Sequence, residues 1–405
     1  SSRNKKKMKR ADYVLYLKPG IPIGVVEAKD NNHAVSDGIQ QALNYSELLD
    51  VPSVYSSNGD AFAFHNKVAT SNENIEGEIK LENFPEHEDL VSRYKIYKNI
   101  DKKNEDIFFQ NFNEDFTDKE IRYYQLNVIN KATLEIIQNK KRLLVVMATG
   151  TGKTFTIFQI LWRLWKAKKI KRALFLVDRN SLADQTINND FKPFGKVLTK
   201  IKNRKIDPSY EIHVGLYQSL PGPDEKDKAY KTVSRNFFDL VVIDECHRGS
   251  ANEDSTWKEI LEYFDSAIHL GMTATPKETK YASNINYFGD PIYTYSLKQG
   301  IEEGFLAPYK VIKVDLDRDI EGWIPPPGMK DDLGQTIEKK YYNQADMDKT
   351  LVLNKRTKIV AKRLMEYLRA TDPYSKTIVF CEDIDHAERM RVAISNEARD
   401  LVKKN

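Results

Sequence analysis

The chain has 405 residues, of which 40% are hydrophobic and 30% charged, and its formal net charge is +4. This length suits two or three domains with real cores, and the charge balance excludes a globally basic protein, so any contact with nucleic acid must come from local patches. Two cysteines exclude a disulfide scaffold, the scattered histidines exclude a zinc site, and the lack of a signal peptide or an apolar run of about 20 residues predicts a cytoplasmic protein with no membrane contact.

The N-terminal pattern is a pair of strands that carries two carboxylates and a lysine. Residues 11–17 and 23–29 read as strands joined by a turn. Because side chains alternate along a strand, Glu27 and Lys29 share a face, and Asp12 on the adjacent strand can meet them. Carboxylates suit Mg²⁺, which can activate water, while an ammonium stabilises charge on a scissile phosphate. The alternative is that these are ordinary solvated charges at strand ends.

A helix is predicted to open at Gly38, with Ile39, Ala42 and Leu43 on its apolar face. Gln41 and Tyr45 are one helical turn apart and therefore lie on one face. Further strands are expected between residues 51 and 64. The helix thus presents an amide and a phenol shortly after the Glu-x-Lys pattern.

Residues 148–154, Ala-Thr-Gly-Thr-Gly-Lys-Thr, lie between an apolar strand pattern at 143–147 and an amphipathic helix pattern at 155–165. The glycines let backbone N–H groups surround a polyphosphate, the lysine supplies positive charge, and the last threonine offers a hydroxyl to Mg²⁺. Met147 is a minor departure, since the strict motif has glycine or alanine there. The predicted nucleotide-binding residues of this loop are Thr149, Gly150, Thr151, Gly152, Lys153 and Thr154.

Residues 239–245 form a continuous apolar strand that ends in two carboxylates. Ligands collect at the carboxyl ends of buried parallel strands. Asp244 can hold Mg²⁺ through water, and Glu245 can polarise the water that attacks the γ-phosphate. His247 is expected to couple this site to its neighbours. The segment 273–276 follows another apolar run and is expected to hydrogen-bond back to the acidic strand end.

Together these motifs resemble the motor of superfamily 2 helicases. Arg122 and Gln125 resemble the adenine-reading Q motif, which implies that the nucleotide is ATP. The segments 177–179 and 217–219 occupy the places of two motifs that touch the nucleic-acid backbone in this superfamily. Five strands between 143 and 275, separated by helix-length segments, predict an α/β fold with a RecA-like, doubly wound parallel sheet.

The N-terminal pattern resembles the PD-(D/E)xK nuclease core, and its combination with the motor resembles type I restriction enzyme motor (R) subunits. The resemblance runs from Ala11 to about Met390. It implies ATP-driven translocation of double-stranded DNA, a Mg²⁺-dependent endonuclease, and partner methyltransferase (M) and specificity (S) subunits. The implied catalytic residues are Asp12, Glu27, Lys29, Gln41, Tyr45, Lys153, Asp244 and Glu245, and the implied metal ligands are Asp12, Glu27, Thr154 and Asp244.

The expected domains are an N-terminally truncated endonuclease at 1–85, a connecting segment at 86–117, the first motor lobe at 118–297 and the start of a second lobe at 298–405. A long insertion is expected at 315–348. Residues 376–381 are expected to form a strand that resembles motif IV, and motifs V and VI are not recognised, so we expect ATP binding with slow hydrolysis.

Two alternatives remain open. One is another superfamily 2 enzyme, such as a repair helicase or a type III restriction motor. The other is an ATP-gated nucleic-acid clamp with an inactive nuclease fold. The basic runs at 5–10 and 166–172 are candidate DNA patches, although a solvated surface is the simpler interpretation of either run.

Overall fold

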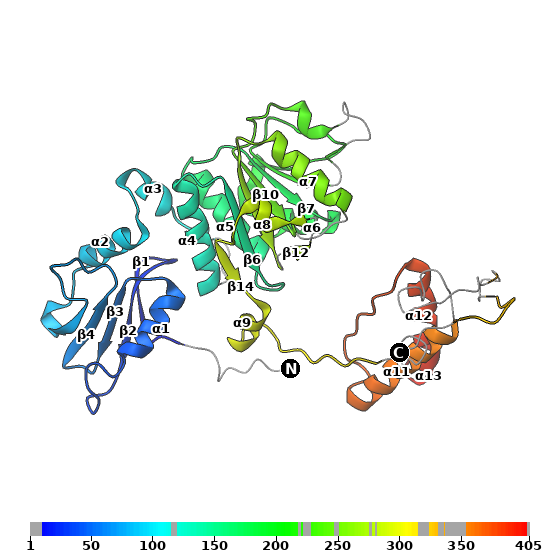
Figure 1. Cartoon of the computed structure of the whole chain (residues 1–405), viewed down its shortest axis with the longest axis horizontal. Helices are drawn as coiled ribbons and strands as arrows, with labels where there is room; N and C mark the ends of the chain where they lie inside the picture. The colour runs from blue at the N-terminus through cyan, green and yellow to red at the C-terminus, as the bar shows by residue number, and fades with distance from the viewer. Residues whose placement is uncertain are drawn as a thin grey trace. The chain divides into compact units, whose positions relative to one another are not determined.

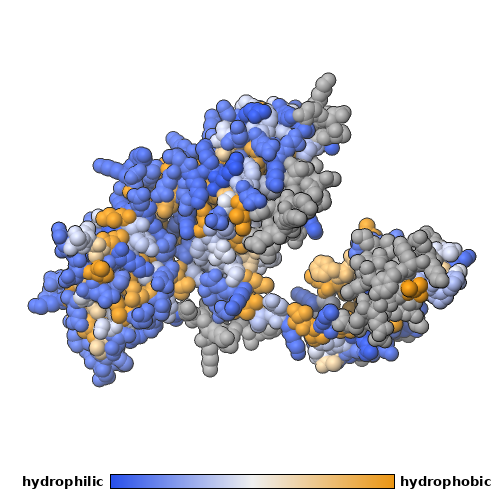
Figure 2. All heavy atoms as spheres, viewed as in Figure 1, coloured by the Kyte–Doolittle hydropathy of each residue, from blue (hydrophilic) through white to orange (hydrophobic). Residues whose placement is uncertain are grey.

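The computed structural model describes residues 10–114, 120–217, 220–221, 228–246, 251–274, 278–279, 282–314, 324–330, 336 and 354–402. The chain divides into two compact units, Ser1–Pro308 and Tyr309–Asn405 (Figure 1). Figure 2 shows mostly hydrophilic residues on the visible surface, with hydrophobic residues in scattered patches. None of the helices in the described residues combines the length and apolarity that a membrane crossing needs.

The first unit begins with a five-stranded sheet in the order β1-β2-β3-β4-β5 (Figure 1). Strand β2 pairs antiparallel with β1 and parallel with β3, and α1 connects β2 to β3 and packs on both. The predicted strands and helix in this region are therefore confirmed. The elements are β1 (Tyr13–Lys18), β2 (Ile21–Ala28), α1 (Ile39–Leu49), β3 (Ser53–Ser57), β4 (Ala61–Asn66) and β5 (Glu76–Lys80).

The segment that follows is part of the same core. Helix α2 (His87–Lys98) packs against β2 and β3, and α3 (Glu105–Phe108) packs against α4 (Tyr123–Ile137). The guanidinium of Arg163 is fully buried and donates to the carbonyl oxygens of Phe108 and Gln110 and to Asn130 Oδ1. These bonds satisfy a buried cation that would otherwise be costly, and they fix residues 108–110 against Arg163 and Asn130.

The first unit also contains a seven-stranded parallel sheet in the order β14-β6-β11-β10-β7-β9-β8. The expectation of five strands between 143 and 275 is wrong, because the described residues contain six strands there, β6 to β11, and β14 joins them in the sheet. The sequence pattern missed β8, a short edge strand whose residues are only half-buried. The strands are β6 (Arg142–Met147), β7 (Ala173–Val177), β8 (Leu198–Lys200), β9 (Ile212–Leu216), β10 (Leu240–Asp244), β11 (Ile268–Thr273) and β14 (Tyr293–Tyr295).

Both faces of this sheet are covered, as the doubly wound prediction requires. Alternate residues of β6 enter different cores: Val145 packs in a cluster with α4 and α5, whereas Val146 packs in a cluster with α7. This division follows from the two-residue period of a strand. The helices are α5 (Lys153–Lys166), α6 (Asn180–Asn188), α7 (Ala251–Tyr263), α8 (Asn284–Phe288) and α9 (Leu297–Glu302), and a small ribbon is formed by β12 (Glu278–Thr279) and β13 (Ala282–Ser283).

The second unit is described as helices α11 (Asn354–Thr371), α12 (Ile384–Glu397) and α13 (Arg399–Val402). Ala361, Met390 and Ala393 form its small core. The strand expected at 376–381 is wrong: these residues make no ladder, and Phe380 is 91% exposed. An apolar run becomes a strand only where a partner strand satisfies its backbone groups, and the described residues offer none. Most of the expected insertion at 315–348 lies outside the described residues.

Candidate functional site

The phosphate-binding loop forms where β6 ends and α5 begins. Gly150 and Gly152 both have a φ of 85°, a left-handed conformation that glycine adopts without steric cost. The Thr151 hydroxyl donates to the carbonyl oxygen of Ala148 over 2.6 Å, which closes the turn. The Met147 side chain is fully buried in the core, so the departure from the motif does not disturb the loop.

A cavity of about 1060 Å³ opens over this loop. It is large enough for a nucleoside triphosphate and has many polar groups. Gly304 and Phe305, which follow α9, also line it, although the sequence assigned no role to them. The lining residues are Glu120, Arg122, Gln125, Thr149, Gly150, Thr151, Gly152, Lys153, Thr154, Phe155, Leu182, Gln185, Thr186, Asp190, Asp244, Glu245, Gly304 and Phe305.

The N-terminal end of α4 ties the predicted adenine-reading residues to the phosphate-binding loop. Gln125 Oε1 accepts from the Arg122 backbone N–H over 3.0 Å, and Gln125 Nε2 donates to the Thr151 carbonyl oxygen over 2.9 Å. The Arg122 guanidinium lies 5.1 Å from the centre of the Phe305 ring. A planar cation and an aromatic ring at the cavity wall provide surfaces on which a flat base can stack.

The acidic end of β10 faces the loop. Glu245 has a φ of 53°, rare for a residue with a side chain, and its backbone N–H donates to Asp244 Oδ1 over 3.0 Å. Lys153 Nζ lies 2.9 Å from Glu245 Oε1, and both side chains are largely buried. The Asp244 carboxylate and the Thr154 hydroxyl are hard oxygen donors that suit Mg²⁺ beside bound phosphates.

Other motor residues lie at neighbouring strand ends. Thr273 is buried at the end of β11, and the Cys246 N–H donates to the Met272 carbonyl oxygen over 3.2 Å, which links the segment at 273 to the acidic strand end. The Tyr217 hydroxyl donates to Asp178 Oδ1 over 3.0 Å, so the two predicted backbone-contacting segments touch. His247, Gln218, Ser219, Thr275 and Pro276 lie outside the described residues.

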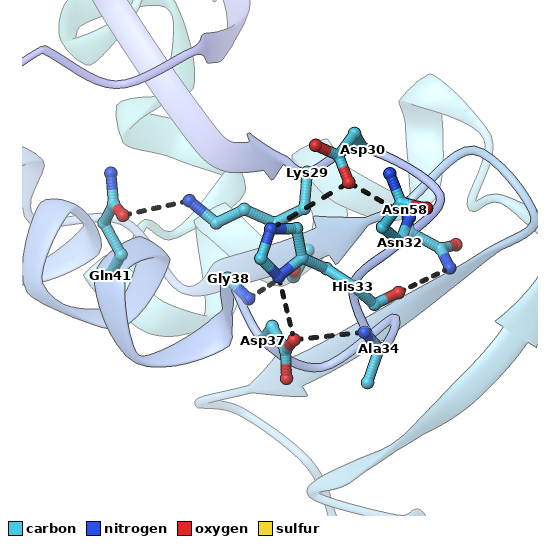
Figure 3. Close-up of polar contacts among 10 residues, drawn as sticks. Lys29, Asp30, Asn32, His33, Ala34, Asp37, Gly38, Gln41 and Asn58 are labelled. Carbon is cyan, nitrogen blue, oxygen red and sulfur yellow. Dashed lines mark hydrogen bonds and ion pairs between the residues drawn. The ribbon is translucent and has the colours of Figure 1, made fainter.

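The structure also brings together the five predicted residues of the N-terminal site. Glu27 is 1% exposed at the end of β2, and Gln41 Nε2 donates to Glu27 Oε1 over 2.5 Å. Lys29 Nζ donates to Gln41 Oε1 over 3.1 Å (Figure 3). The same ammonium lies 3.7 Å from Glu27 Oε1. The Tyr45 hydroxyl lies 3.5 Å from Gln41 Nε2, and Asp12 Oδ2 accepts from the Ala28 N–H over 3.0 Å.

The charges of this site are only partly compensated. Burial raises the pKa of Glu27, and the neighbouring Asp12 carboxylate raises it further, while Lys29 opposes them. Glu27 Oε2 is buried and accepts no hydrogen bond. A divalent cation between Asp12 and Glu27 would satisfy that oxygen and remove the repulsion, so the two side chains fit Mg²⁺.

A third ligand would have to come from elsewhere, since the described residues contain no cluster of three or more His, Cys, Asp or Glu side chains with metal-binding geometry. Mg²⁺ commonly keeps several waters and takes one or two protein carboxylates together with substrate phosphate oxygens. Two carboxylates are therefore sufficient for a site that also binds a phosphate.

The loop between β2 and α1 holds these residues in place. His33 Nδ1 lies 3.3 Å from Asp37 Oδ2, and Asn58 Nδ2 donates to the His33 carbonyl oxygen over 3.0 Å (Figure 3). The Gly38 N–H donates to the Ser56 hydroxyl oxygen over 3.1 Å. This network, which the sequence did not predict, fixes the start of α1 and hence the approach of Gln41 to Glu27.

Two family models match the chain in separate segments. One is described as the N terminus of the type I restriction enzyme R protein and matches residues 1–73. The other is described as the type III restriction enzyme res subunit and matches residues 118–278. The first covers the five predicted residues of the N-terminal site, including Glu27. The second covers the phosphate-binding loop and the acidic end of β10.

Individual relatives match almost the whole chain. The EcoAI endonuclease subunit of Escherichia coli, a type I restriction enzyme, is 54% identical over 98% of this chain and 49% of its own length. The EcoKI endonuclease subunit of E. coli K12 is 27% identical over 96% of this chain and 39% of its own length. The chain thus spans about half the length, or less, of these curated relatives.

A solved structure supports the same likeness. A fragment from Vibrio vulnificus YJ016, described as an HsdR subunit of a type I restriction enzyme, aligns with a TM-score of 0.72 and 37% identity. The alignment covers 98% of this chain and 66% of that one. The likeness therefore includes both the N-terminal sheet and the motor.

Proposed function

The chain belongs to the family of type I restriction enzyme R subunits, and from this we propose that it serves as an ATP-driven translocase of double-stranded DNA joined to a Mg²⁺-dependent endonuclease. We further propose that it acts in the cytoplasm with methyltransferase and specificity subunits. The observation that carries the proposal is the presence, within one compact unit, of a cavity suited to a nucleotide and, separately, of the buried Glu27 carboxylate beside the exposed Asp12 carboxylate and Lys29.

In the motor, each residue acts on the charge of the nucleotide. Lys153 would exchange its ion pair with Glu245 for the β- and γ-phosphates, which leaves Glu245 available to orient and polarise the attacking water. Thr154 and Asp244 would hold Mg²⁺, which neutralises charge on the phosphates. Arg122, Gln125 and Phe305 would hold the base. Because Gln125 also donates a hydrogen bond to Thr151, the position of the base would be coupled to that of the phosphate-binding loop.

In the nuclease, Asp12 and Glu27 would hold Mg²⁺, which would supply the Lewis acidity that activates water for attack on a DNA phosphate. Lys29 would stabilise the negative charge that develops on the phosphate. Gln41 holds Glu27 and Lys29 at once, so it sets the distance between the metal site and the cation. Tyr45 lies beside Gln41 and would contact the DNA or a bound water.

The two activities are tested together in an enzyme assembled with its methyltransferase and specificity subunits. Glu245→Gln should abolish ATP turnover and with it DNA cleavage. Lys29→Gln should abolish cleavage and leave DNA-stimulated ATP turnover unchanged, because the two sites share no side chain. Tyr13→Phe, a change in the neighbouring strand on an exposed side chain, is the matched control and should preserve both activities.

Each failure has a distinct meaning. Normal ATP turnover in the Glu245→Gln enzyme would contradict the motor assignment. Normal cleavage in the Lys29→Gln enzyme would contradict the nuclease assignment and leave a superfamily 2 motor of another kind, such as a repair helicase or a type III restriction motor. A wild-type enzyme that binds ATP and DNA but neither cleaves nor translocates would favour an ATP-gated clamp.

A further inference from the structure

A concentrated basic segment lies in a part of the motor to which the recognised motifs assign no role. Residues 191–206 contain no aspartate or glutamate, in a chain whose net charge is only +4. The segment includes β8, the edge strand of the motor sheet, and the turn that follows it. Its cationic residues are Lys192, Lys196, Lys200, Lys202, Arg204 and Lys205.

The topology of the sheet places this turn on the functional edge. All seven strands are parallel, so residues that follow β8 share an edge with those that follow β6, β7 and β10. That edge carries the phosphate-binding loop, the Asp178–Arg179 pair and Glu245. Strand β8 is three strands from β10, which corresponds to about 15 Å at about 4.8 Å per strand. The turn is therefore close enough to extend one continuous surface from the ATP site.

The turn has an unusual backbone. Lys202 and Lys205 form an antiparallel bridge, and Asn203 and Arg204 between them have φ angles of 51° and 54°. Such a two-residue turn favours Asn-Gly, because glycine takes the second left-handed position without strain. This chain has arginine there instead. The turn therefore presents an exposed arginine between two exposed lysines.

The cations of the turn are available for a ligand. Lys202, Arg204 and Lys205 are exposed and lie within ion-pair distance of no carboxylate in the described part of the chain, while Ile201 and Ile206 are buried and anchor the turn. The exception in the segment is Lys200, whose ammonium lies 2.7 Å from Asp184 Oδ1. Beside the turn is a groove of about 480 Å³, lined in part by Asn188, Lys192, Thr199 and Lys202.

We propose that this turn, together with Lys192 in the groove, binds the phosphate backbone of the double-stranded DNA on which the motor acts. The DNA contact surface then runs from Asp178–Arg179 and Tyr217 across β9 to the edge strand β8. The contact is independent of base sequence, because flexible exposed cations reach phosphates without reading base edges. This inference rests on the proposed function, since it takes the motor substrate to be DNA.

A second basic segment in the motor provides a matched control. Lys168, Lys169 and Lys171 precede β7, so they lie at the amino ends of the strands, on the edge opposite to the phosphate-binding loop. They carry the same charge as the turn. If net positive charge alone attracted DNA, neutralising either set would have the same effect.

The test measures binding of a fluorescent 30-base-pair duplex to the 405-residue chain by anisotropy, between 50 and 200 mM salt. The triple change Lys202→Gln, Arg204→Gln and Lys205→Gln should weaken binding roughly tenfold to a hundredfold at 50 mM salt. The slope of log K against log salt should become shallower by about 2.7, or about 0.9 for each lost phosphate contact. The control triple is Lys168→Gln, Lys169→Gln and Lys171→Gln. It should change the affinity at 50 mM salt and the slope of log K against log salt by no more than the loss of about one phosphate contact would.

A single substitution separates the DNA role from a folding role. Arg204→Gly relieves the strained backbone, so it should raise the melting temperature of the chain and yet weaken duplex binding roughly threefold. A higher melting temperature with unchanged DNA affinity would overturn the proposal, as would equal losses from the two triples. If the wild-type chain binds ATP but no duplex at all, that result contradicts the proposed DNA motor and therefore also this inference.

Discussion

The two candidate sites of the first unit differ in whether a buried carboxylate is paired with a cation. In the motor, the Glu245 carboxylate is paired with the Lys153 ammonium at 2.9 Å. In the N-terminal site, Glu27 faces Asp12, another carboxylate, while Lys29 stands 3.7 Å away and is partly exposed. The motor site is internally compensated without a ligand, and the N-terminal site is not. If the proposed ligands bind, the first site has to break an ion pair, whereas the second site gains a cation beside its two carboxylates.

The largest expected effect comes from breaking the compensated pair. Lys153→Met should lower the free energy of unfolding of the first unit by about 3 kcal/mol, because it removes the ammonium that lies 2.9 Å from the mostly buried Glu245 carboxylate. The double variant Lys153→Met, Glu245→Gln should recover most of this loss. Thermal melting of the chain at pH 7 and low salt provides the measurement, and equal stability of the single and double variants would contradict an energetically coupled pair.

The geometry of the phosphate-binding loop predicts the next largest effect. A Cβ atom at Gly152 would lie 2.4 Å from Gln125 Nε2, and the residue has a φ of 85°. Gly152→Ala should therefore weaken ATP binding by about 2 kcal/mol, roughly thirtyfold, as strain in the loop combines with displacement of Gln125. Calorimetric titration with a non-hydrolysable ATP analogue measures this.

Gly289 supplies a control for that substitution. It has a similar φ of 82°, but a methyl group added there would meet no atom of the described residues within 4 Å, and it lies outside the nucleotide cavity. Gly289→Ala should lose stability through backbone strain and keep wild-type affinity for the analogue. A loss of ATP affinity in this variant would mean that strain alone, and not the contact with Gln125, explains the effect at Gly152.

A smaller effect with a definite pH dependence is expected at Glu27. Because the pKa of Glu27 is raised in the folded chain, the folded state favours the protonated carboxyl group. The stability that protonated Glu27 contributes is present at low pH and is lost as the pH rises through the folded pKa. Glu27→Gln should thus stabilise the metal-free chain on the order of 1 kcal/mol at pH 7. The gain should shrink as the pH falls through the folded pKa of Glu27, because the carboxyl group is then protonated in the folded chain.

Added Mg²⁺ should reverse the stability difference between the wild-type chain and Glu27→Gln. Millimolar Mg²⁺ should raise the melting temperature of the wild-type chain at pH 7 and leave that of Glu27→Gln unchanged, because ligand binding to the folded state alone stabilises it. The nucleotide site has to be held constant in this comparison, so both chains carry Asp244→Asn. A wild-type response to Mg²⁺ no larger than that of Glu27→Gln would contradict the assignment of Glu27 as a metal ligand.

The smallest expected effect on stability is at Tyr45. Its hydroxyl is 3.5 Å from Gln41 Nε2, the limit of a hydrogen bond, so Tyr45→Phe should change the free energy of unfolding by less than about 0.5 kcal/mol. If the hydroxyl contacts DNA or a bound water, cleavage by the assembled enzyme should nevertheless fall several-fold. Unchanged cleavage would limit the N-terminal site to Asp12, Glu27, Lys29 and Gln41.

The sequence alone predicted those features whose chemistry is local. The phosphate-binding loop was recognisable because glycines, lysine and threonine at fixed spacing follow an apolar strand pattern. The convergence of Asp12, Glu27 and Lys29 was predictable from the two-residue period of adjacent strands, and the Gln41–Tyr45 face from the helical period. The buried parallel strand at Leu240–Asp244 likewise indicated that its two terminal carboxylates lie at a ligand-binding edge.

The tertiary structure decided what depends on contacts between distant residues. It added β8 to the edge of the sheet, brought Phe305 beside Arg122 into the cavity over the phosphate-binding loop, and paired Lys153 with Glu245. It also left residues 376–381 without a strand. Periodicity reports which faces of an element are apolar, but not which partner is present, and hydrogen-bonded ladders, ion pairs and pKa shifts all depend on that partner.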